Sequence, residues 1–176
     1  VIFYLQAMYL MSFLRINRGF TDGEVNNLAN FCYIIMAIAC LCSGYLSDII
    51  GRRKIFVVNL LVIILVTPFL MNIIETSNFC FIIIAQVILS ILAAFYIGPE
   101  PALQAEFYPT NVRNTALSLS YNTATSIFGG TTPLIVEYLV QRTGTITSAT
   151  YYVVACSIIS LIALYFYKNR SNHKHL

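Results

Sequence analysis

Residues 44–54 read Gly-Tyr-Leu-Ser-Asp-Ile-Ile-Gly-Arg-Arg-Lys, and two apolar segments, 28–47 and 55–74, meet at this stretch. Gly51 permits a tight turn between the two segments. Asp48 lies at the expected membrane boundary, where an unpaired charge is costly, so it needs a basic side chain or a helix N-terminus as its partner. The stretch therefore predicts a short charged turn between two membrane-spanning helices.

The composition of the whole chain agrees with a membrane protein. Of the 176 residues, 59% are apolar and 10% are charged, whereas an average soluble domain has about 25% charged residues. A soluble domain of this size cannot bury so much apolar surface, because its surface is large relative to its volume. These proportions argue against a soluble enzyme, a disordered chain and a nucleic-acid-binding protein. The five cysteines form no CxxC pair, so they suggest neither a disulfide framework nor a zinc site.

Hydropathy divides the chain into six candidate membrane spans and predicts an all-α membrane protein. A helix needs about 20 mostly apolar residues to cross about 30 Å of hydrocarbon. The sixth candidate, 1–14, covers only about 21 Å at about 1.5 Å per residue. It is either a re-entrant segment or a helix whose beginning is missing, and we favour the second interpretation. The five full-length candidates are 28–47, 55–74, 79–98, 115–140 and 149–167.

Basic residues gather on one side of the predicted bundle. That side has seven of them, namely Arg52, Arg53, Lys54, Arg113, Lys168, Arg170 and Lys174. The opposite side has three, namely Arg15, Arg18 and Arg142. Because cytoplasmic loops of membrane proteins carry an excess of Lys and Arg, we expect the first side and the C-terminus to be cytoplasmic. Six spans with both ends inside are consistent with half of a transporter.

The spacing of residues 44–54 resembles the loop signature of the major facilitator superfamily, G-x-x-x-D-x-x-G-R-(R/K)-(R/K). The basic cluster alone would be an anchor on the cytoplasmic side, but the whole spacing favours the signature. Gly44 would permit close approach of a neighbouring helix. The family carries the motif once in each six-helix half. The matching positions are Gly44, Asp48, Gly51, Arg52, Arg53 and Lys54.

A second loop, residues 99–113, indicates which half the chain resembles. Glu106 to Arg113 fit the pattern E-(F/L)-(F/Y)-P-T-x-x-R and look like the loop between the tenth and eleventh helices of the superfamily. Residues 3–10 and 118–133 are similar to the seventh and eleventh helices of its metabolite:proton symporter branch, which includes proline/betaine, α-ketoglutarate, citrate and shikimate transporters. The resemblance implies the six-helix C-terminal half of a twelve-helix major facilitator fold, with the first helix truncated.

The resemblance also implies a mechanism, which is alternating access by rocking of two halves with a gate on the cytoplasmic side. The acid of the motif, here Asp48, would brace against a helix of the missing N-terminal half. The arginine of the motif would pair with an acid of the second loop, so that Arg52 or Arg53 would meet Glu106. The gating residues implied in this way are Gly44, Asp48, Gly51, Arg52, Arg53, Glu106 and Arg113.

Polar side chains at membrane depth predict the solute path, because such groups usually face other helices or a water-filled cavity. Gln6 and Tyr9 are three residues apart and share a helical face, while Gln86 lies near mid-depth of its span. An aromatic residue such as Tyr33 is suited to stack on a quaternary ammonium group. The alternative for each residue is a hydrogen bond between helices. The predicted path comprises Gln6, Tyr9, Tyr33, Gln86 and Asn122.

The predicted spans hold no acid at depth. Glu137 lies near the outer end of the fifth span, where we expect it to pair with Arg142. The coupling proton that the family resemblance implies would then be carried by an acid in the missing half. In the same span Gly129, Gly130 and Pro133 weaken the helix, either as a flexing point or for close packing.

The sequence therefore predicts part of a secondary active transporter and not an enzyme. We expect proton symport of a compatible solute such as proline or betaine, or of a carboxylate. The partners would be the solute, the proton, the lipid bilayer and the missing N-terminal half, in a bacterial inner membrane. No cofactor, metal or nucleic acid is expected, since His173 and His175 alone are a poor metal site. Two alternatives stay open. One is a sugar porter of the same superfamily, and the other is a non-transporting product of a split gene, either a relic or a membrane-embedded partner.

Overall fold

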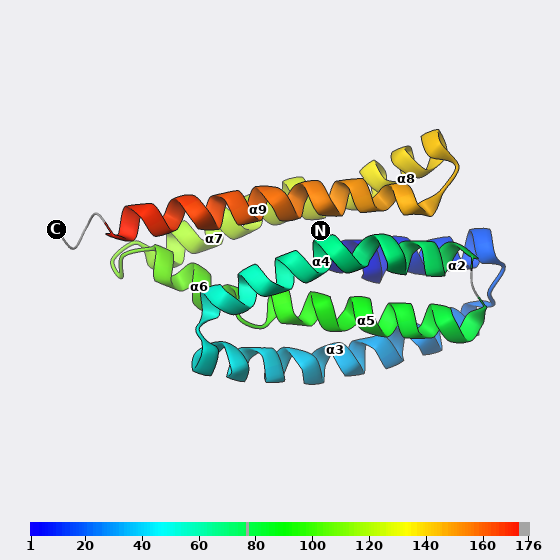
Figure 1. The fold of residues 1–176 in the computed structure, drawn as a ribbon, viewed down its shortest axis with the longest axis horizontal. Helices are drawn as coiled ribbons and strands as arrows, with labels where there is room; N and C mark the ends of the chain where they lie inside the picture. The colour runs from blue at the N-terminus through cyan, green and yellow to red at the C-terminus, as the bar shows by residue number, and fades with distance from the viewer. Residues whose placement is uncertain (77, 173–176) are drawn as a thin grey trace.

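The structure, a computed structural model, describes residues 1–76 and 78–172. Helices make up all regular structure in this part of the chain, and the long ones run side by side between the two ends of an elongated bundle (Figure 1). In chain order the elements are α1 (Ile2–Tyr4), the π-helix η1 (Leu5–Tyr9), α2 (Leu10–Arg18), α3 (Asp22–Ile50), α4 (Arg52–Thr76), α5 (Phe79–Ile97), α6 (Glu100–Phe107), α7 (Arg113–Ala124), the π-helix η2 (Thr125–Gly129), α8 (Thr132–Thr143), the 3-10 helix η3 (Ile146–Ser148) and α9 (Ala149–Asn172).

Within the described residues, neighbouring elements combine into six helical rods. The first rod consists of α1, η1 and α2, which follow one another without a gap. The fourth consists of α5 and α6, and the fifth of α7, η2 and α8. The second, third and sixth rods are the single helices α3, α4 and α9. The all-α, six-helix fold predicted from the sequence is confirmed.

Four helical stretches among the described residues are long and apolar enough to cross a membrane. The first rod is too short to count among them, and the fifth is interrupted by η2. In addition, α7 is rich in Asn, Ser and Thr. The predicted segments 1–14 and 115–140 fall in these two rods. The first and fifth rods therefore differ from the other four, each of which contains one long apolar helical stretch. The four stretches are Asp22–Ile50, Arg52–Thr76, Phe79–Phe107 and Ile146–Phe166.

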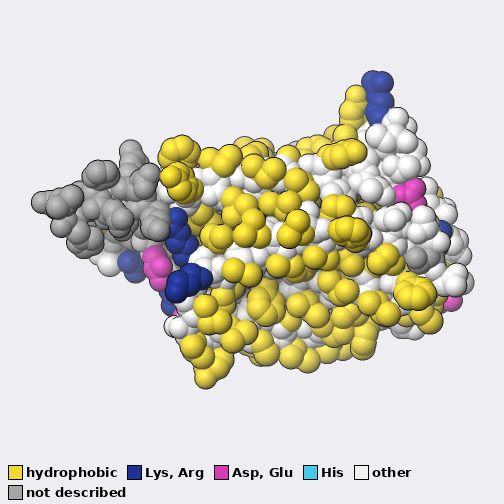
Figure 2. All heavy atoms as spheres, viewed as in Figure 1, with side chains coloured by type: hydrophobic (Ala, Val, Ile, Leu, Met, Phe, Trp, Pro, Cys, Tyr) yellow, Lys and Arg dark blue, Asp and Glu magenta, His cyan; other side chains and the backbone are white. Residues whose placement is uncertain are grey.

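The outside of the bundle is apolar along its length and charged near its ends. Figure 2 shows a broad band of hydrophobic side chains, with basic and acidic side chains toward the two ends. Leu41, Phe69 and Leu134 are 79%, 71% and 73% exposed. A water-soluble protein rarely exposes such a large continuous apolar surface, whereas lipid chains cover it in a bilayer. The chain is therefore an integral membrane protein.

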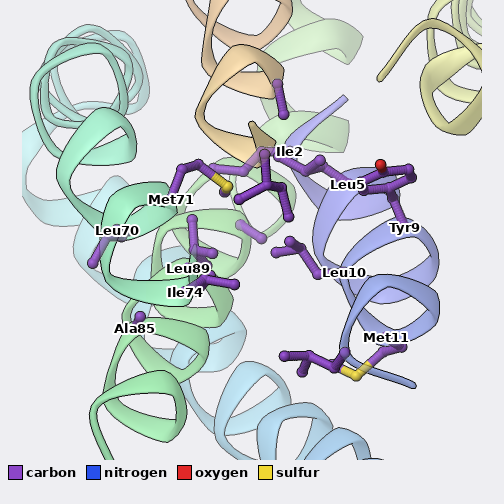
Figure 3. Packing of buried hydrophobic residues seen from close by; sticks show 14 of the residues in the cluster. Ile2, Leu5, Tyr9, Leu10, Met11, Leu70, Met71, Ile74, Ala85 and Leu89 are labelled. Carbon is purple, nitrogen blue, oxygen red and sulfur yellow. The ribbon is translucent and has the colours of Figure 1, made fainter. Parts of the chain in front are cut away.

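The main core lies where the first rod packs against α4 and α5. Leu5 and Leu10 of the first rod are fully buried and face Met71 and Ile74 of α4 and Leu89 of α5 (Figure 3). Lipid tails are as apolar as these side chains, so close packing rather than escape from water stabilises the contact. A smaller cluster joins α4, α6 and α9, and it consists of Phe56, Leu60, Leu103 and Leu164.

Local sequence fixes both ends of α3. At its N-terminus the Glu24 amide donates to Thr21 Oγ1 at 3.4 Å, and the Thr21 amide donates to Glu24 Oε2 at 2.9 Å, which completes a capping box. At its C-terminus Gly51 has a φ of +102°, a conformation that residues with a side chain rarely adopt. This tight turn starts α4 directly at Arg52 and leaves Asp48 one helical turn away.

Candidate functional site

The α3–α4 turn and α6 lie at the same end of the bundle, which we call the basic end because of the Arg-Arg-Lys run at 52–54. Arg52 contacts two acids there. Its Nη1 donates to Glu106 Oε1 at 2.6 Å, and its Nη2 and Nε donate to Asp48 Oδ1 at 2.9 and 3.2 Å. One guanidinium thus links α3, α4 and α6. Of the two arginines that the sequence left open, Arg52 rather than Arg53 meets Glu106.

The ion pairs of Arg52 are partly exposed. Side-chain exposure is 31% for Arg52, 62% for Asp48 and 55% for Glu106. Exposed ion pairs stabilise a protein by about 0–1 kcal/mol each, because water screens their attraction. The cluster therefore holds the basic end together, but breaking its contacts costs little free energy. Asp48 has a partner within this chain, although the family resemblance led us to expect one in the other half.

Two further predicted gating residues make separate contacts. Arg53 Nη2 donates to the backbone carbonyl of Leu164, so it ties α4 to α9. Arg113 Nε donates to the backbone carbonyl of Tyr108 at 3.3 Å, a contact within its own loop. The basic end is thus held by one shared ion cluster and by two arginines that bind backbone oxygens.

The close helix approach that we expected at Gly44 is not made to any described residue of this chain. Among the described residues, no atom lies within 4 Å of the position that a Cβ at Gly44 would occupy. The reason is that Ser43 and Ser47 lie on the buried face of α3. The close approach occurs at Gly98, where a Cβ would lie 2.7 Å from the carbonyl oxygen of Cys40 and would also collide with Ser43 Oγ. Gly98 therefore lets the α5–α6 junction pack against the backbone of α3.

Two predicted path residues, Gln6 and Gln86, are fully buried between the first rod and α5. Gln6 Nε2 donates to Ser90 Oγ at 3.0 Å, and the Ser90 hydroxyl donates to the carbonyl of Gln86 at 2.8 Å. The side-chain oxygen of Gln6 and both side-chain polar atoms of Gln86 have no hydrogen-bond partner in the described part of the chain. These contacts match the interhelical alternative. Sequence reasoning missed Ser90, although it follows Gln86 by one helical turn.

Tyr33 and Asn122 lie away from this buried pair. Tyr33 donates to the carbonyl of Ala7 at 3.4 Å and lines a cleft of about 370 Å³ between the first rod and α3. Arg15 also lines the cleft, but its charge is already paired with Asp22 at 3.3 Å. Asn122 is exposed on α7. The cleft is lined by Ala7, Met11, Arg15, Val25, Asn26, Ala29, Asn30 and Tyr33.

Tyr9, the fifth predicted path residue, contacts an acid. Its hydroxyl donates to Glu137 Oε2 at 2.9 Å, and Gln141 Nε2 donates to the other oxygen, Oε1, also at 2.9 Å. Arg142, which we expected as the partner of Glu137, instead has its guanidinium carbon 5.4 Å from the ring centroid of Tyr138. Side chains four residues apart share a helix face, which selects Gln141 for Glu137 and Tyr138 for Arg142.

Both rods that meet at Glu137 contain a π-helical turn. In the first rod this turn is η1, which ends at Tyr9, and in the fifth rod it is η2. The interruption that we expected from the glycines and the proline of the fifth rod is present. Gly129, at the end of η2, packs against Tyr4, since a Cβ there would lie 2.6 Å from the ring carbon Cε2. Gly129 thus serves close packing between the two rods.

A metal centre is not visible in the part of the chain that the structure describes. No group of three His, Cys, Asp or Glu side chains gathers there as metal ligands would. All five cysteines are free thiols. His173, Lys174 and His175, which the sequence analysis named, lie outside the described residues.

The helical rods of the described residues, with their apolar exterior and charged ends, define a polytopic integral membrane protein. The chain belongs to the Major Facilitator Superfamily, whose family model matches residues 1–176. This is a family of membrane transporters and not of enzymes. The family resemblance carried by the two loop motifs is confirmed.

Three curated relatives illustrate the similarity. The chain is 29% identical over 161 residues to a Staphylococcus haemolyticus protein named "Putative proline/betaine transporter". It is 28% identical over 165 residues to the "Ectoine/proline transporter ProP" of Corynebacterium glutamicum, and 30% identical over 168 residues to the "Inner membrane metabolite transport protein YhjE" of Escherichia coli. The matches cover 92%, 93% and 93% of this chain, but 34%, 32% and 38% of the relatives. The chain thus spans about a third of the length of these relatives. No solved structure matches the chain significantly.

Proposed function

We propose that the chain is the six-helix C-terminal half of a secondary active transporter that moves a small solute by alternating access. The observation that carries the proposal is the contact between Arg52 Nη1 and Glu106 Oε1 at 2.6 Å. It joins two loop motifs that are far apart in the sequence into one ion-paired cluster. Family membership supports the transporter class, and coverage of about a third of the relatives is consistent with a second half.

In this proposal the cluster of Asp48, Arg52 and Glu106 is a gate on the cytoplasmic side. While its pairs are formed, the ends of α3, α4 and α6 are held together and the basic end is closed. Each exposed pair contributes about 0–1 kcal/mol, so rocking of the two halves breaks and re-forms the cluster in each transport cycle. The tight turn at Gly51 keeps Asp48 and Arg52 in register for this purpose.

The proposed substrate is a compatible solute of the proline or betaine type, and a small carboxylate is the second class. Relatives named as transporters of proline, betaine and ectoine support the first class. We propose that an inward proton gradient drives the transport. The sugar porter alternative has no support among these three relatives.

The proposed location is a bacterial inner membrane with the basic end and the C-terminus in the cytoplasm. The excess of Lys and Arg on that side supports this orientation. A relative named as an inner membrane protein supports the membrane. The partners in this proposal are the solute, the proton, the bilayer and the N-terminal half.

Solute uptake into membrane vesicles tests the proposal. Radiolabelled proline, betaine, α-ketoglutarate and glucose are offered to vesicles with and without a proton gradient. One set of vesicles holds this chain alone, and a second set holds it joined to its upstream coding sequence. We expect gradient-dependent uptake of proline, betaine or α-ketoglutarate by the joined form alone. Uptake of glucose alone would favour the sugar porter, and no uptake by either inserted form would favour the non-transporting alternative.

A further inference from the structure

We propose that Glu137, held by Tyr9 and Gln141, is the carboxyl group that takes up and releases the coupling proton of the transport cycle. The inference rests on the proposed function, since only a proton symporter has a coupling proton. It places the proton-carrying group in this half of the bundle, whereas the sequence alone assigned it to the missing half.

Both oxygens of the Glu137 carboxylate accept a hydrogen bond from an uncharged donor. The Tyr9 hydroxyl donates to Oε2 and the Gln141 amide donates to Oε1, each at 2.9 Å. Tyr9 is only 6% exposed, whereas Glu137 is exposed. The carboxylate is thus oriented by a buried partner on one side and is not covered by this chain on the other.

The two partners suit both charge states of the carboxyl group. The ionised form accepts from the Tyr9 hydroxyl and from the Gln141 amide. When Oε2 is protonated, it donates to the Tyr9 oxygen, whose own hydrogen rotates away, because a phenol is both a donor and an acceptor. Gln141 continues to donate to Oε1. Since no heavy atom has to move, Glu137 can gain and lose a proton within a fixed contact.

Glu137 has no counter-charge among the described residues. No ion pair in that part of the chain includes it, and Arg142 on the same helix is stacked on a tyrosine ring. The elements packed against α8 present Tyr9 from η1 and Tyr152 from α9, and Tyr152 donates to a backbone carbonyl of η2. Glu75 accepts from a hydroxyl of η3. An unpaired charge inside a membrane-protein bundle is costly, which makes this carboxyl group a candidate for a change of charge during transport.

The π turns link the proton site to the shape of its two rods. A π turn inserts one residue into a helix and often marks a functional site. The turn η1 ends at Tyr9, and η2 ends at Gly129, before α8 and Glu137. If η1 or η2 returned to a regular α-helix, the side chain of Tyr9 or of Glu137 would rotate about its helix axis. The rotation would be about 100°, which is the angle between successive residues of an α-helix. The Tyr9–Glu137 hydrogen bond would then break, so a change of helix register would separate Glu137 from the phenol that positions it.

Glu137 lies along the bundle and not at its tip. The last residue of α8 is Thr143. Along the helix axis, Glu137 lies about 9 Å before it, at a rise of about 1.5 Å per residue. Tyr9 precedes Arg18, the last residue of α2, by about 14 Å on the same scale. The pair therefore lies inside the two rods rather than at their ends, on the side away from the basic end. In the proposed orientation, a proton reaches it from outer water while the basic end is closed.

The step itself is a proton transfer. A proton from water on the outer side binds Glu137 Oε2 and changes the charge of the carboxyl group from minus one to zero. After the halves have rocked, the same proton leaves to water on the cytoplasmic side. Only the O–H bond forms and breaks, and no group is oxidised or reduced.

The test is Glu137→Gln in this chain joined to its upstream coding sequence, assayed in vesicles. Glutamine keeps the size of the side chain but cannot change its charge. One proton that crosses 100 mV is worth about 2.3 kcal/mol, which corresponds to about 50-fold solute accumulation. We expect the variant to lose this accumulation and reach a ratio of about one, because its site no longer carries a proton. Exchange of labelled for unlabelled solute without a gradient should continue, since it requires no proton release.

Two further variants complete the experiment. Glu75→Gln changes another acid near the same end of the bundle, and it should accumulate solute like the wild type. Tyr9→Phe keeps the ring and removes the hydroxyl that positions Glu137. This variant should alter the pH profile of accumulation while exchange continues, which a purely structural role of Tyr9 would not produce.

The outcomes separate this inference from the function it rests on. Accumulation by Glu137→Gln at the wild-type ratio would overturn the inference and leave the proposed function intact. Loss of both accumulation and exchange would also overturn it, since Glu137 would then serve solute binding or folding. A wild-type protein without any gradient-dependent accumulation would refute the proposed function itself.

Discussion

Two contacts between rods lie toward opposite ends of the bundle, and they are built in different ways. At the basic end Arg52 joins Asp48 and Glu106 through exposed ion pairs. Toward the other end the buried Tyr9 hydroxyl meets Glu137, which has no counter-charge within residues 1–76 and 78–172. The first contact has fixed charges and opens when its partners separate. In the proposed transport cycle the second changes its charge while its partners stay together, so the two ends would serve different parts of that cycle.

The helices that carry the two contacts also differ, because those at the basic end are continuous and those at the other contact are interrupted. At the basic end α3 and α4 are continuous helices of 29 and 25 residues, joined by the turn at Gly51. The first and fifth rods each contain a π turn. A continuous helix moves as a rigid body, whereas a π turn permits a local change of register. Substitutions where the interrupted rods meet should therefore disturb the protein more than substitutions at the basic end.

Gly129→Val should have the largest effect on stability. Its side chain would occupy the space of the Tyr4 ring, which lies 2.6 Å from the position of a Cβ. Overpacking of this kind costs about 1–3 kcal/mol. A lower midpoint of thermal unfolding in detergent would show this cost. Gly44→Val is the matched control, because open space surrounds its Cβ position among the described residues. Equal midpoints for the two variants would mean that the packing at Gly129 does not hold the interrupted rods together.

Part of the basic end could be predicted from the sequence, namely its turn and, from the family resemblance, the contact of an arginine with Glu106. Asp48 and Arg52 are four residues apart, and the turn at Gly51 separates the helices that carry them. Glu106 belongs to a second recognisable loop pattern. The number and length of the helices follow from hydropathy in the same way. The contact between Arg52 and Glu106 joins residues 54 positions apart, and the resemblance of the two loops to family motifs implied it.

The Tyr9–Glu137 contact could not be predicted, because it joins residues 128 positions apart. Its formation depends on the register of two rods, which the π turns shift by one residue, and hydropathy does not report a π turn. The close approach at Gly98 could not be predicted for a similar reason. Glycine shows where helices can approach closely, but packing decides which face of α3 is buried.

Arg52→Gln should have the next largest effect, which we expect on solute uptake. It removes the shared cation from two acids, and loss of two exposed pairs costs about 1 kcal/mol in total. Such a change shifts a conformational equilibrium about fivefold, so we expect uptake by the joined protein to fall severalfold. Arg52→Glu combined with Glu106→Arg should restore part of it. Arg142→Gln changes an arginine at the opposite end and should leave uptake unaltered. Equal uptake by the Arg52 and Arg142 variants would remove the gating role from this cluster.

Ser90→Ala tests the buried contact between the first rod and α5, where we expect a smaller effect. The substitution removes Ser90 Oγ, which accepts a hydrogen bond from the side-chain amide of Gln6 at 3.0 Å. Gln6 lies on the first rod, two residues after Tyr4. Hydrogen bonds between membrane helices contribute about 0.6 kcal/mol on average, so the unfolding midpoint should fall slightly. Ser120→Ala is the control, since that hydroxyl is exposed and donates within its own helix. A midpoint for Ser90→Ala equal to that of Ser120→Ala would show that the buried amides add nothing to the packing of the first rod.

Asp48→Asn should have the smallest effect on stability. An ion pair four residues apart on a helix contributes about 0.3–0.5 kcal/mol, and asparagine has nearly the same shape as aspartate. The unfolding midpoint of the chain should hardly change. A large loss of uptake in the joined protein therefore could not come from the pair with Arg52 and would indicate a partner in the other half, which is the result we expect. Uptake at the wild-type rate would exclude Asp48 from gating. The basic end would then act as a clamp through Arg52 and Glu106, and the difference between the two ends would be one between a structural contact and a proton site.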